Sequence, residues 1–235
     1  MKTLLISWAN KGREDYPKAL KRNIKEALKH YKGDVAYYSD DAAFEVVEGI
    51  KINPSPTGLP SHKDTPYGFK PFLFNKAFEE GYEQVLWLDS TIVVEADLEP
   101  IFKLLNKWGV LAFHNLGHNL KEWISDAAIN TTGLNIEEDP KQIMACVVGF
   151  DITNETGKRI FKEWLELSKD GVSFQNNGST RPGFKAHRHD QAILSALVHK
   201  NKLPLLPYGV LVYEPHNETK EFGDEIYFTN KAIKP

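Results

Sequence analysis

Short apolar runs alternate with polar turns along the first ninety residues. Residues 4–8, 35–38 and 85–88 are continuously apolar or nearly so, a pattern typical of strands buried on both faces of a sheet. Helices are predicted for residues 17–30, where apolar positions share one face, and for residues 71–81. Strand, helix and strand in succession indicate an α/β domain with a parallel sheet.

The same alternation continues to the end of the chain. Further strands are predicted for residues 110–113 and 144–150, an extended segment for 92–94, and short apolar runs at 210–212 and 226–228. Helices are predicted for residues 98–108, 153–168 and about 190–200. Residues 53–67 hold four prolines and residues 171–183 are rich in Gly, Asn and Ser, so both segments are predicted to be loops. His114 and His118 are also assigned to a loop. No repeat or long linker interrupts the pattern, and residues 1–235 are predicted to form a single domain.

Composition narrows the class of protein. Hydrophobic residues make up 41 % and charged residues 26 % of the chain, which excludes collagen-like and intrinsically disordered proteins. The net charge of −3 argues against binding to nucleic acid by bulk electrostatics. A single cysteine, Cys146, allows no intramolecular disulfide and suits a reducing compartment. No signal-peptide pattern and no apolar run of about 20 residues is present, so we expect a cytoplasmic protein without a transmembrane segment.

Several nucleotide and hydrolase motifs are missing. Residues 7–12, after the first predicted strand, contain neither the dinucleotide-binding glycine triplet nor a Walker lysine loop. The chain also lacks the Gly-x-Ser-x-Gly turn of α/β-hydrolases. Dehydrogenase, P-loop and α/β-hydrolase functions are therefore disfavoured.

Two acidic residues occupy positions where an α/β protein binds ligands. Asp89 follows the buried strand at 85–88, and open sheets bind ligands beyond the carboxyl ends of their strands. Asp190 opens the helix at about 190–200, after the Gly-rich loop. Each acid has a simpler explanation as well, since Asp89 could cap a turn and Asp190 could serve as a helix N-cap.

The segment from Phe69 to Thr91 resembles the donor site of GT-A-fold glycosyltransferases, in which a lysine-containing helix leads into a strand that ends in Asp-x-Asp. The resemblance implies a GT-A-like (Rossmann-like) mixed, mostly parallel sheet flanked by helices. It also implies a nucleotide-sugar donor such as a UDP-sugar. Asp89 takes the place of the first Asp, which contacts the ribose and a divalent metal, Mn or Mg. Thr91 stands where the second Asp is expected, so metal dependence is in doubt.

Two later segments carry the same resemblance. Asp190-Gln191 is similar to the Asp-Gln motif of retaining GT-A families, where the Asp contacts a sugar and the Gln lies near the anomeric carbon. Both residues are therefore expected to be catalytic, with retention of anomeric configuration. His216 resembles the late histidine that ligates the metal or the diphosphate in these families, so Asp89 and His216 are the residues that could hold a metal ion between them.

The resemblance also assigns residues to donor binding. The end of the first strand would line the nucleotide pocket, Asp40 would bind the base or ribose, and Gly149 would lie near the donor sugar, although close backbone packing explains that glycine equally well. Developing negative charge on the leaving diphosphate needs a cation, for which Lys70 and Arg188 are candidates beside a metal. The expected donor-binding residues are Ser7, Trp8, Ala9, Asp40, Lys70, Asp89, Ser90, Gly149 and Arg188.

The sequence thus predicts a glycosyltransferase with a nucleotide-sugar donor. The acceptor is open: a glycan, lipid, protein, small molecule or modified nucleobase would each fit. One alternative is a metal-dependent hydrolase built on His187, His189, Asp190 and Asp89, although such sites usually contain more ligands. The other is a non-catalytic nucleotide-sugar binder, which the missing second Asp suggests.

Overall fold

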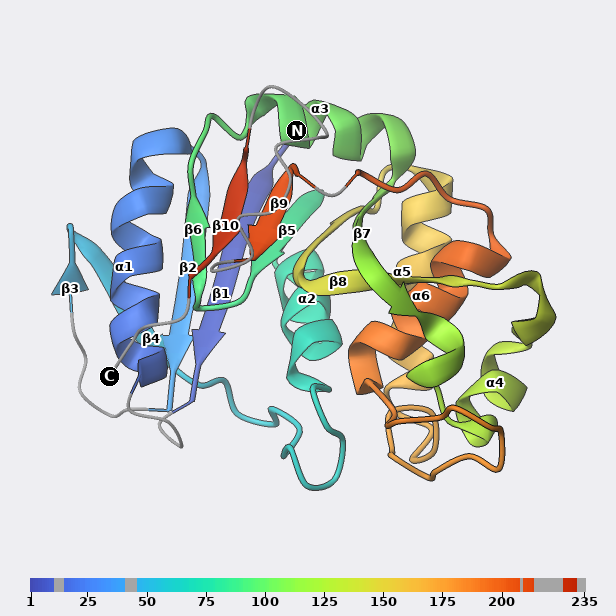
Figure 1. The fold of residues 1–235 in the computed structure, drawn as a ribbon. Helices are drawn as coiled ribbons and strands as arrows, with labels where there is room; N and C mark the ends of the chain where they lie inside the picture. The colour runs from blue at the N-terminus through green and yellow to red at the C-terminus, as the bar shows by residue number, and fades with distance from the viewer. Residues whose placement is uncertain (11–14, 41–45, 208, 214–225, 232–235) are drawn as a thin grey trace.

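The computed structural model describes residues 1–10, 15–40, 46–207, 209–213 and 226–231. Within these ranges the chain forms an α/β structure around a large mixed sheet with the strand order β3-β4-β2-β1-β5-β8-β7 (Figure 1). Its strands are β1 (Thr3–Ala9), β2 (Asp34–Ser39), β3 (Val46–Val47), β4 (Ile50–Pro54), β5 (Gln84–Leu88), β7 (Val110–Asn119) and β8 (Lys141–Asp151). A smaller sheet has the order β6-β10-β9, with β6 (Ile92–Val94), β9 (Leu211–Tyr213) and β10 (Phe228–Asn230).

The large sheet divides at the boundary between β5 and β8. On one side, β4, β2, β1 and β5 run parallel, and their carboxyl ends meet at one edge. On the other side, β8 is antiparallel to both β5 and β7. The parallel pairs therefore occupy only one part of the sheet, and the expectation of a mostly parallel sheet is too strong: the described pairings are three parallel and three antiparallel.

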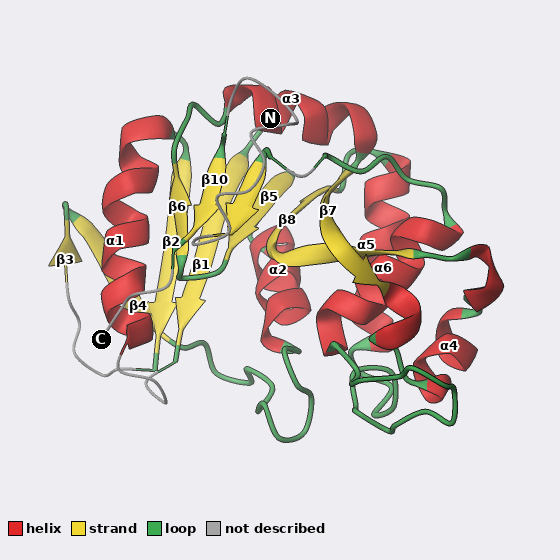
Figure 2. Ribbon diagram, in the orientation of Figure 1, coloured by secondary structure: helices red, strands yellow, loops and turns green. Residues whose placement is uncertain are grey.

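Helices cover both faces of the large sheet (Figure 2). One face packs against α2, α4, α5 and α6, and the other packs against α1, α3 and the small sheet. The bounds are α1 (Asp15–His30), α2 (Phe69–Glu79), α3 (Glu99–Trp108), α4 (Asp126–Thr132), α5 (Glu155–Leu167) and α6 (His189–Lys200), with short 3-10 turns at Leu120–Glu122 and Ile136–Glu138. Among the described residues no helix is both long and apolar enough to cross a membrane.

Most predicted elements are confirmed within a few residues, and the exceptions have simple causes. Residues 92–94 do extend the chain, but as β6 of the small sheet, paired with β10. His114 and His118 lie in β7 and not in a loop, because β7 continues past its apolar run along β8. The short strands β3 and β4 and the seven-residue helix α4 were not predicted, since none has a long enough periodic pattern.

Candidate active site

Lys70 joins the two acids that the sequence singles out. Its Nζ lies 3.1 Å from Asp89 Oδ1 and 3.1 Å from Asp190 Oδ2, and it donates a hydrogen bond of 2.7 Å to the carbonyl oxygen of Ala145. Lys70 is only 3 % exposed, at the start of α2. The three charged groups come from α2, the end of β5 and the start of α6, so tertiary packing brings together segments 19 to 120 residues apart in the chain.

Asp89 is held at the carboxyl end of β5 by its backbone and its side chain. Its N–H donates to the carbonyl oxygen of Cys146 on β8 at 2.8 Å, and its own carbonyl accepts from Ile92 at 2.9 Å. The indole N–H of Trp87 donates to Asp89 Oδ1 at 2.6 Å. The carboxyl side chain remains 35 % exposed, so it is fixed in direction yet open to a ligand.

Asp190 is the buried member of the pair. It lies in the first turn of α6 and is 3 % exposed. The N-cap position belongs to Arg188, whose side chain makes no capping bond, so the interpretation of Asp190 as the N-cap is wrong. Burial raises the pKa of Asp190, and nearby Asp89 adds to the rise, against the opposing effects of Lys70 and the Gln191 N–H.

The lysine is the charged counterpart of both acids. Burial by itself would lower the pKa of Lys70, but the carboxylates of Asp190 and Asp89 more than offset that effect and raise it above its ordinary value. Lys70 therefore stays protonated at neutral pH. With both acids ionised, the cluster of Lys70, Asp89 and Asp190 carries one net negative charge, and one carboxylate is in excess of what the lysine can neutralise.

Two cavities meet at Asp89, the most exposed member of this cluster. One has a volume of about 360 Å³ and the other about 450 Å³, and Tyr67 and Asp89 line both of them. The shared residues make the two cavities neighbouring parts of one cleft, at the edge of the sheet where the parallel strands end.

The first cavity, hereafter the aromatic cavity, is walled mainly by rings. Trp8 packs against Phe69 with ring centroids 4.5 Å apart, and the ring centroids of Phe69 and Trp87 are 5.7 Å apart. Aromatic faces of this kind stack well on flat or weakly polar ligand surfaces. The complete lining is Trp8, Asn10, Tyr16, His62, Tyr67, Phe69, Trp87, Asp89, Ser90 and Thr91.

The second cavity, hereafter the polar cavity, contains the buried ends of the charged cluster. Lys70, Asp190 and Gln191 line it, together with Ala145 and Cys146 in the middle of β8. Trp123, Asn176 and Arg188 also line it. The cavity therefore combines the fixed charges with hydrogen-bonding groups suited to a polar substrate.

The end of β1 contributes only one of its three predicted residues to the cleft. Trp8 lines the aromatic cavity, but Ser7 and Ala9 are 0 % and 1 % exposed and line neither cavity. Successive side chains of a strand point to opposite faces, so Ser7 and Ala9 face the α1 side of the sheet, away from both cavities. Ser7 and Ala9 therefore do not lie at the cleft, where they were predicted, whereas Ser90 lines the aromatic cavity.

Two other predicted donor residues lie outside both cavities. Asp40 is exposed, and it accepts a 2.5 Å hydrogen bond from Ser55, whose hydroxyl in turn accepts from the Trp8 indole at 2.7 Å. Gly149 faces the opposite side of the sheet, where a Cβ would lie 3.1 Å from Leu111. Because β8 runs antiparallel to β5, its middle residues Ala145 and Cys146 reach the cleft, whereas Gly149 pairs with Leu86, farther from the carboxyl end of β5. Close packing, the alternative given for this glycine, accounts for its small size.

His187 is tied into the structure near α4. Its Nδ1 accepts from the Ser125 N–H at 3.2 Å and its Nε2 lies 2.8 Å from the carbonyl oxygen of Ser173. Burial, helped by neighbouring His189, lowers the pKa of His187 to about 4. With both ring nitrogens engaged by backbone atoms, His187 offers a metal no free ligand atom, which leaves the hydrolase alternative without its first histidine.

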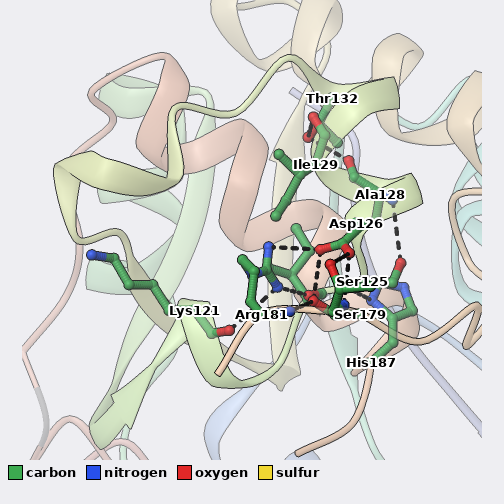
Figure 3. A network of polar contacts seen from close by, with 11 residues as sticks. Lys121, Ser125, Asp126, Ala128, Ile129, Thr132, Ser179, Arg181 and His187 are labelled. Atoms are coloured by element: carbon green, nitrogen blue, oxygen red, sulfur yellow. Dashed lines mark hydrogen bonds and ion pairs between the residues drawn. The ribbon is translucent and has the colours of Figure 1, made fainter. Parts of the chain in front are cut away.

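The Gly-rich loop at 171–183 is fastened to the start of α4 (Figure 3). Asp126 accepts from the Ser179 hydroxyl at 2.6 Å and from the Thr180 N–H at 2.9 Å, and it forms an ion pair with Arg181 at 3.4 Å. These bonds, led by the one from Ser179, lower the pKa of Asp126. The loop is thus tied to α4 through Ser179, Thr180 and Arg181 and to His187 through the Ser173 carbonyl.

The described residues are a poor set of ligands for the expected metal ion. Asp89 Oδ1 already accepts from Trp87 and faces the Lys70 ammonium, and Thr91 supplies only a neutral hydroxyl. No group of three His, Cys, Asp or Glu side chains is arranged to hold a metal ion in the part of the chain that the structure describes. His216, the other expected ligand, lies outside the described residues. The cation beside Asp89 is instead the lysine.

Several lining residues were not predicted from the sequence. Tyr67 borders both cavities and has a positive φ of 61°, which is rare for a residue with a side chain. Its ring stacks on His189, which also has a positive φ. Trp123 and Asn176 come from segments without a recognisable motif. Only the proline-rich composition of residues 53–67 could have drawn attention to the loop that carries Tyr67.

A comparison with models of protein families and with curated proteins finds no match to the chain. The functional interpretation therefore depends on the geometry of this cleft.

Proposed function

We propose that the protein is a glycosyltransferase of GT-A-like architecture that uses a nucleotide-sugar donor. The observation that carries the proposal is the Lys70 ammonium between Asp89 and Asp190 in the polar cavity, with the aromatic cavity adjoining it at Asp89. The parts of a nucleotide sugar follow one another in a matching order: a flat base, a charged diphosphate linker and a polyhydroxylated sugar ring.

The aromatic cavity suits the nucleoside. The half-buried ring of Trp8 and the exposed ring of Tyr67 provide faces on which a base can stack, whereas Phe69 and Trp87 are buried and back the cavity wall. Ser90 and Thr91 add hydroxyl groups to the cavity lining. Asp89, which lines both cavities, would accept hydrogen bonds from the ribose. The sugar would then lie in the polar cavity, beside Asp190 and Gln191.

The chemistry requires stabilisation of positive charge on the sugar. As the bond between the anomeric carbon and the diphosphate oxygen breaks, the ring acquires oxocarbenium character. The Asp190 carboxylate, fixed by Lys70 in a buried setting, is oriented to stabilise that charge without reorganising. The acceptor oxygen forms the new bond, and its proton passes to the departing diphosphate.

We further propose that configuration is retained. Asp190 is held by Lys70 and by the first turn of α6, so it is poorly placed to move towards an acceptor proton as an inverting base would. A measurement of the product anomer by NMR spectroscopy tests this assignment.

Isosteric amide substitutions test the function. Because the cluster has one carboxylate in excess, Asp89→Asn and Asp190→Asn each leave Lys70 with one acidic partner, and both variants should fold. We expect each to lower donor hydrolysis and sugar transfer by about 100-fold or more, in a panel of nucleoside diphosphate sugars. Asp34→Asn, at the amino end of β2 and so at the sheet edge away from the cleft, is the matched control, and its hydrolysis and transfer rates should be unchanged.

The same assay addresses the remaining alternative. Full activity in Asp89→Asn or Asp190→Asn would show that these acids are not the reacting groups. Binding of a nucleotide sugar by the natural chain without hydrolysis or transfer would instead identify a non-catalytic binder.

A further inference from the structure

Arg188 presents a positive charge in the lining of the polar cavity. Its guanidinium carbon lies 4.4 Å from the centroid of the Trp123 ring, and its backbone N–H donates to the Trp123 carbonyl at 3.0 Å. The side chain is exposed and lines the cavity. Stacking on an indole restricts the guanidinium and leaves its N–H edge free for a planar anionic group.

The neighbouring basic side chains are already engaged. Lys185, which also approaches the Trp123 ring, forms an ion pair with Glu122 at 2.9 Å. Arg181 is paired with Asp126, and Lys70 is shared by two aspartates. Arg188, in contrast, has no acidic partner among the residues that the structure describes. Trp123 contributes a second unused donor, since its buried indole N–H has no partner in the described ranges.

The position of Arg188 separates it from the nucleoside end of the cleft. Arg188 and Trp123 line the polar cavity but not the aromatic one, and the two cavities meet at Tyr67 and Asp89. With the base of the donor in the aromatic cavity and its sugar beside Asp190, Arg188 and Trp123 line the part of the cleft that the nucleoside does not occupy.

We propose that Arg188 binds an anionic group of the acceptor, either a carboxylate or a phosphate. This inference rests on the proposed glycosyltransferase function and names the acceptor class that the proposal leaves open. Arginine suits both groups, because its planar fork of donors matches two oxygens at once. The guanidinium would orient the acceptor so that one of its hydroxyl groups points towards the sugar beside Asp190.

The test measures affinity directly with three probes. Binding of glucuronate, glucose 6-phosphate and glucose to the full chain is followed by ligand-observed NMR, with and without saturating UDP. We expect one of the charged probes, at least, to bind about tenfold or more tightly than glucose. Arg188→Gln should reduce that affinity to the level of glucose, whereas Lys185→Gln, the matched control, should not.

Each outcome has a defined meaning. Preference for glucuronate identifies a carboxylate acceptor and preference for glucose 6-phosphate a phosphorylated one. Equal affinity for all three probes, or an equal loss in Lys185→Gln, would overturn the inference. So would an Arg188→Gln variant that loses affinity for UDP alone, because Arg188 would then contact the donor. Failure of the natural chain to bind any nucleotide contradicts the proposed function instead, whether or not the anion binds at Arg188.

Discussion

β5 and β8 lie side by side and both reach the candidate active site, but they do so in opposite directions. β5 arrives with its carboxyl end and contributes a charged side chain, Asp89. β8 arrives with its first half and contributes backbone acceptors, the carbonyl of Ala145 to Lys70 and that of Cys146 to the Asp89 N–H. It also supports α6, since the Ile143 N–H donates to Ser195 at 3.0 Å.

The difference shows how a mixed sheet can build a polar site. The parallel strands supply side chains at their ends, whereas the antiparallel neighbour supplies a fixed backbone against which those side chains are oriented. Lys70 contacts both contributions, together with Asp190 from α6. The cluster thus depends on the junction between the two parts of the sheet.

The largest expected effect comes from removing the group that joins the two strands. Lys70→Met should lower the free energy of unfolding by about 3–5 kcal/mol, because the buried Asp190 carboxylate loses its counter-charge. Chemical denaturation measures the change. Lys76→Met, on the same helix with an exposed partner in Glu80, is the control and should change stability by less than about 0.5 kcal/mol. A loss below about 1 kcal/mol in Lys70→Met would show that the cluster does not hold the junction together.

A smaller effect distinguishes the two faces of β8. In Gly149→Ala the new Cβ would lie 3.1 Å from Leu111 and 3.2 Å from Leu105, so overpacking should lower the free energy of unfolding by about 1–3 kcal/mol. The affinity for UDP should stay unchanged, because this position faces away from the cleft. Thermal unfolding and a UDP titration of the same sample make the comparison. Weaker UDP binding at unchanged stability would support the prediction that Gly149 lies at the donor site.

The smallest effect is a pH dependence that belongs to the α6 side of the cluster. The raised pKa of Asp190 means that the folded protein keeps this proton when the unfolded chain has already lost it. Relative to Asp190→Asn, the natural chain should therefore lose stability as pH rises from the ordinary pKa of aspartate to the raised one, by at most about 1.4 kcal/mol per pH unit. Urea denaturation of both chains across this range measures the slope, and a slope of opposite sign would contradict the raised pKa.

The parts of the site that sequence reasoning could find are those with a local signal. An apolar strand followed by an acid predicts Asp89 at the sheet edge, and an acid that opens an amphipathic helix predicts Asp190 near a ligand. The structure brings these two residues to the same ammonium group. Their proximity could be expected only through the resemblance, since nothing in either segment refers to the other.

The parts of the site that sequence reasoning could not find depend on the direction of a strand and on the side of the sheet that a side chain faces. A continuous apolar run such as residues 144–150 predicts a buried strand but does not say which way it runs, and the error at Gly149 follows from that. Ser7 and Trp8 are adjacent in sequence but face opposite sides of the sheet, which only the packing of α1 and α2 decides. The left-handed backbone of Tyr67 likewise has no signal in its residue type.

The sharing of one lysine by two acids has an evolutionary consequence. Replacing Lys70 with a neutral residue would leave two carboxylates in mutual repulsion. Replacing either Asp89 or Asp190 with a basic residue would place a second positive charge beside the buried ammonium. Descendants of this chain should therefore keep Lys70, Asp89 and Asp190 as a set, or replace the lysine together with Asp190. Exposed helix positions such as Lys76 and Glu80 can be substituted one at a time without a compensating change.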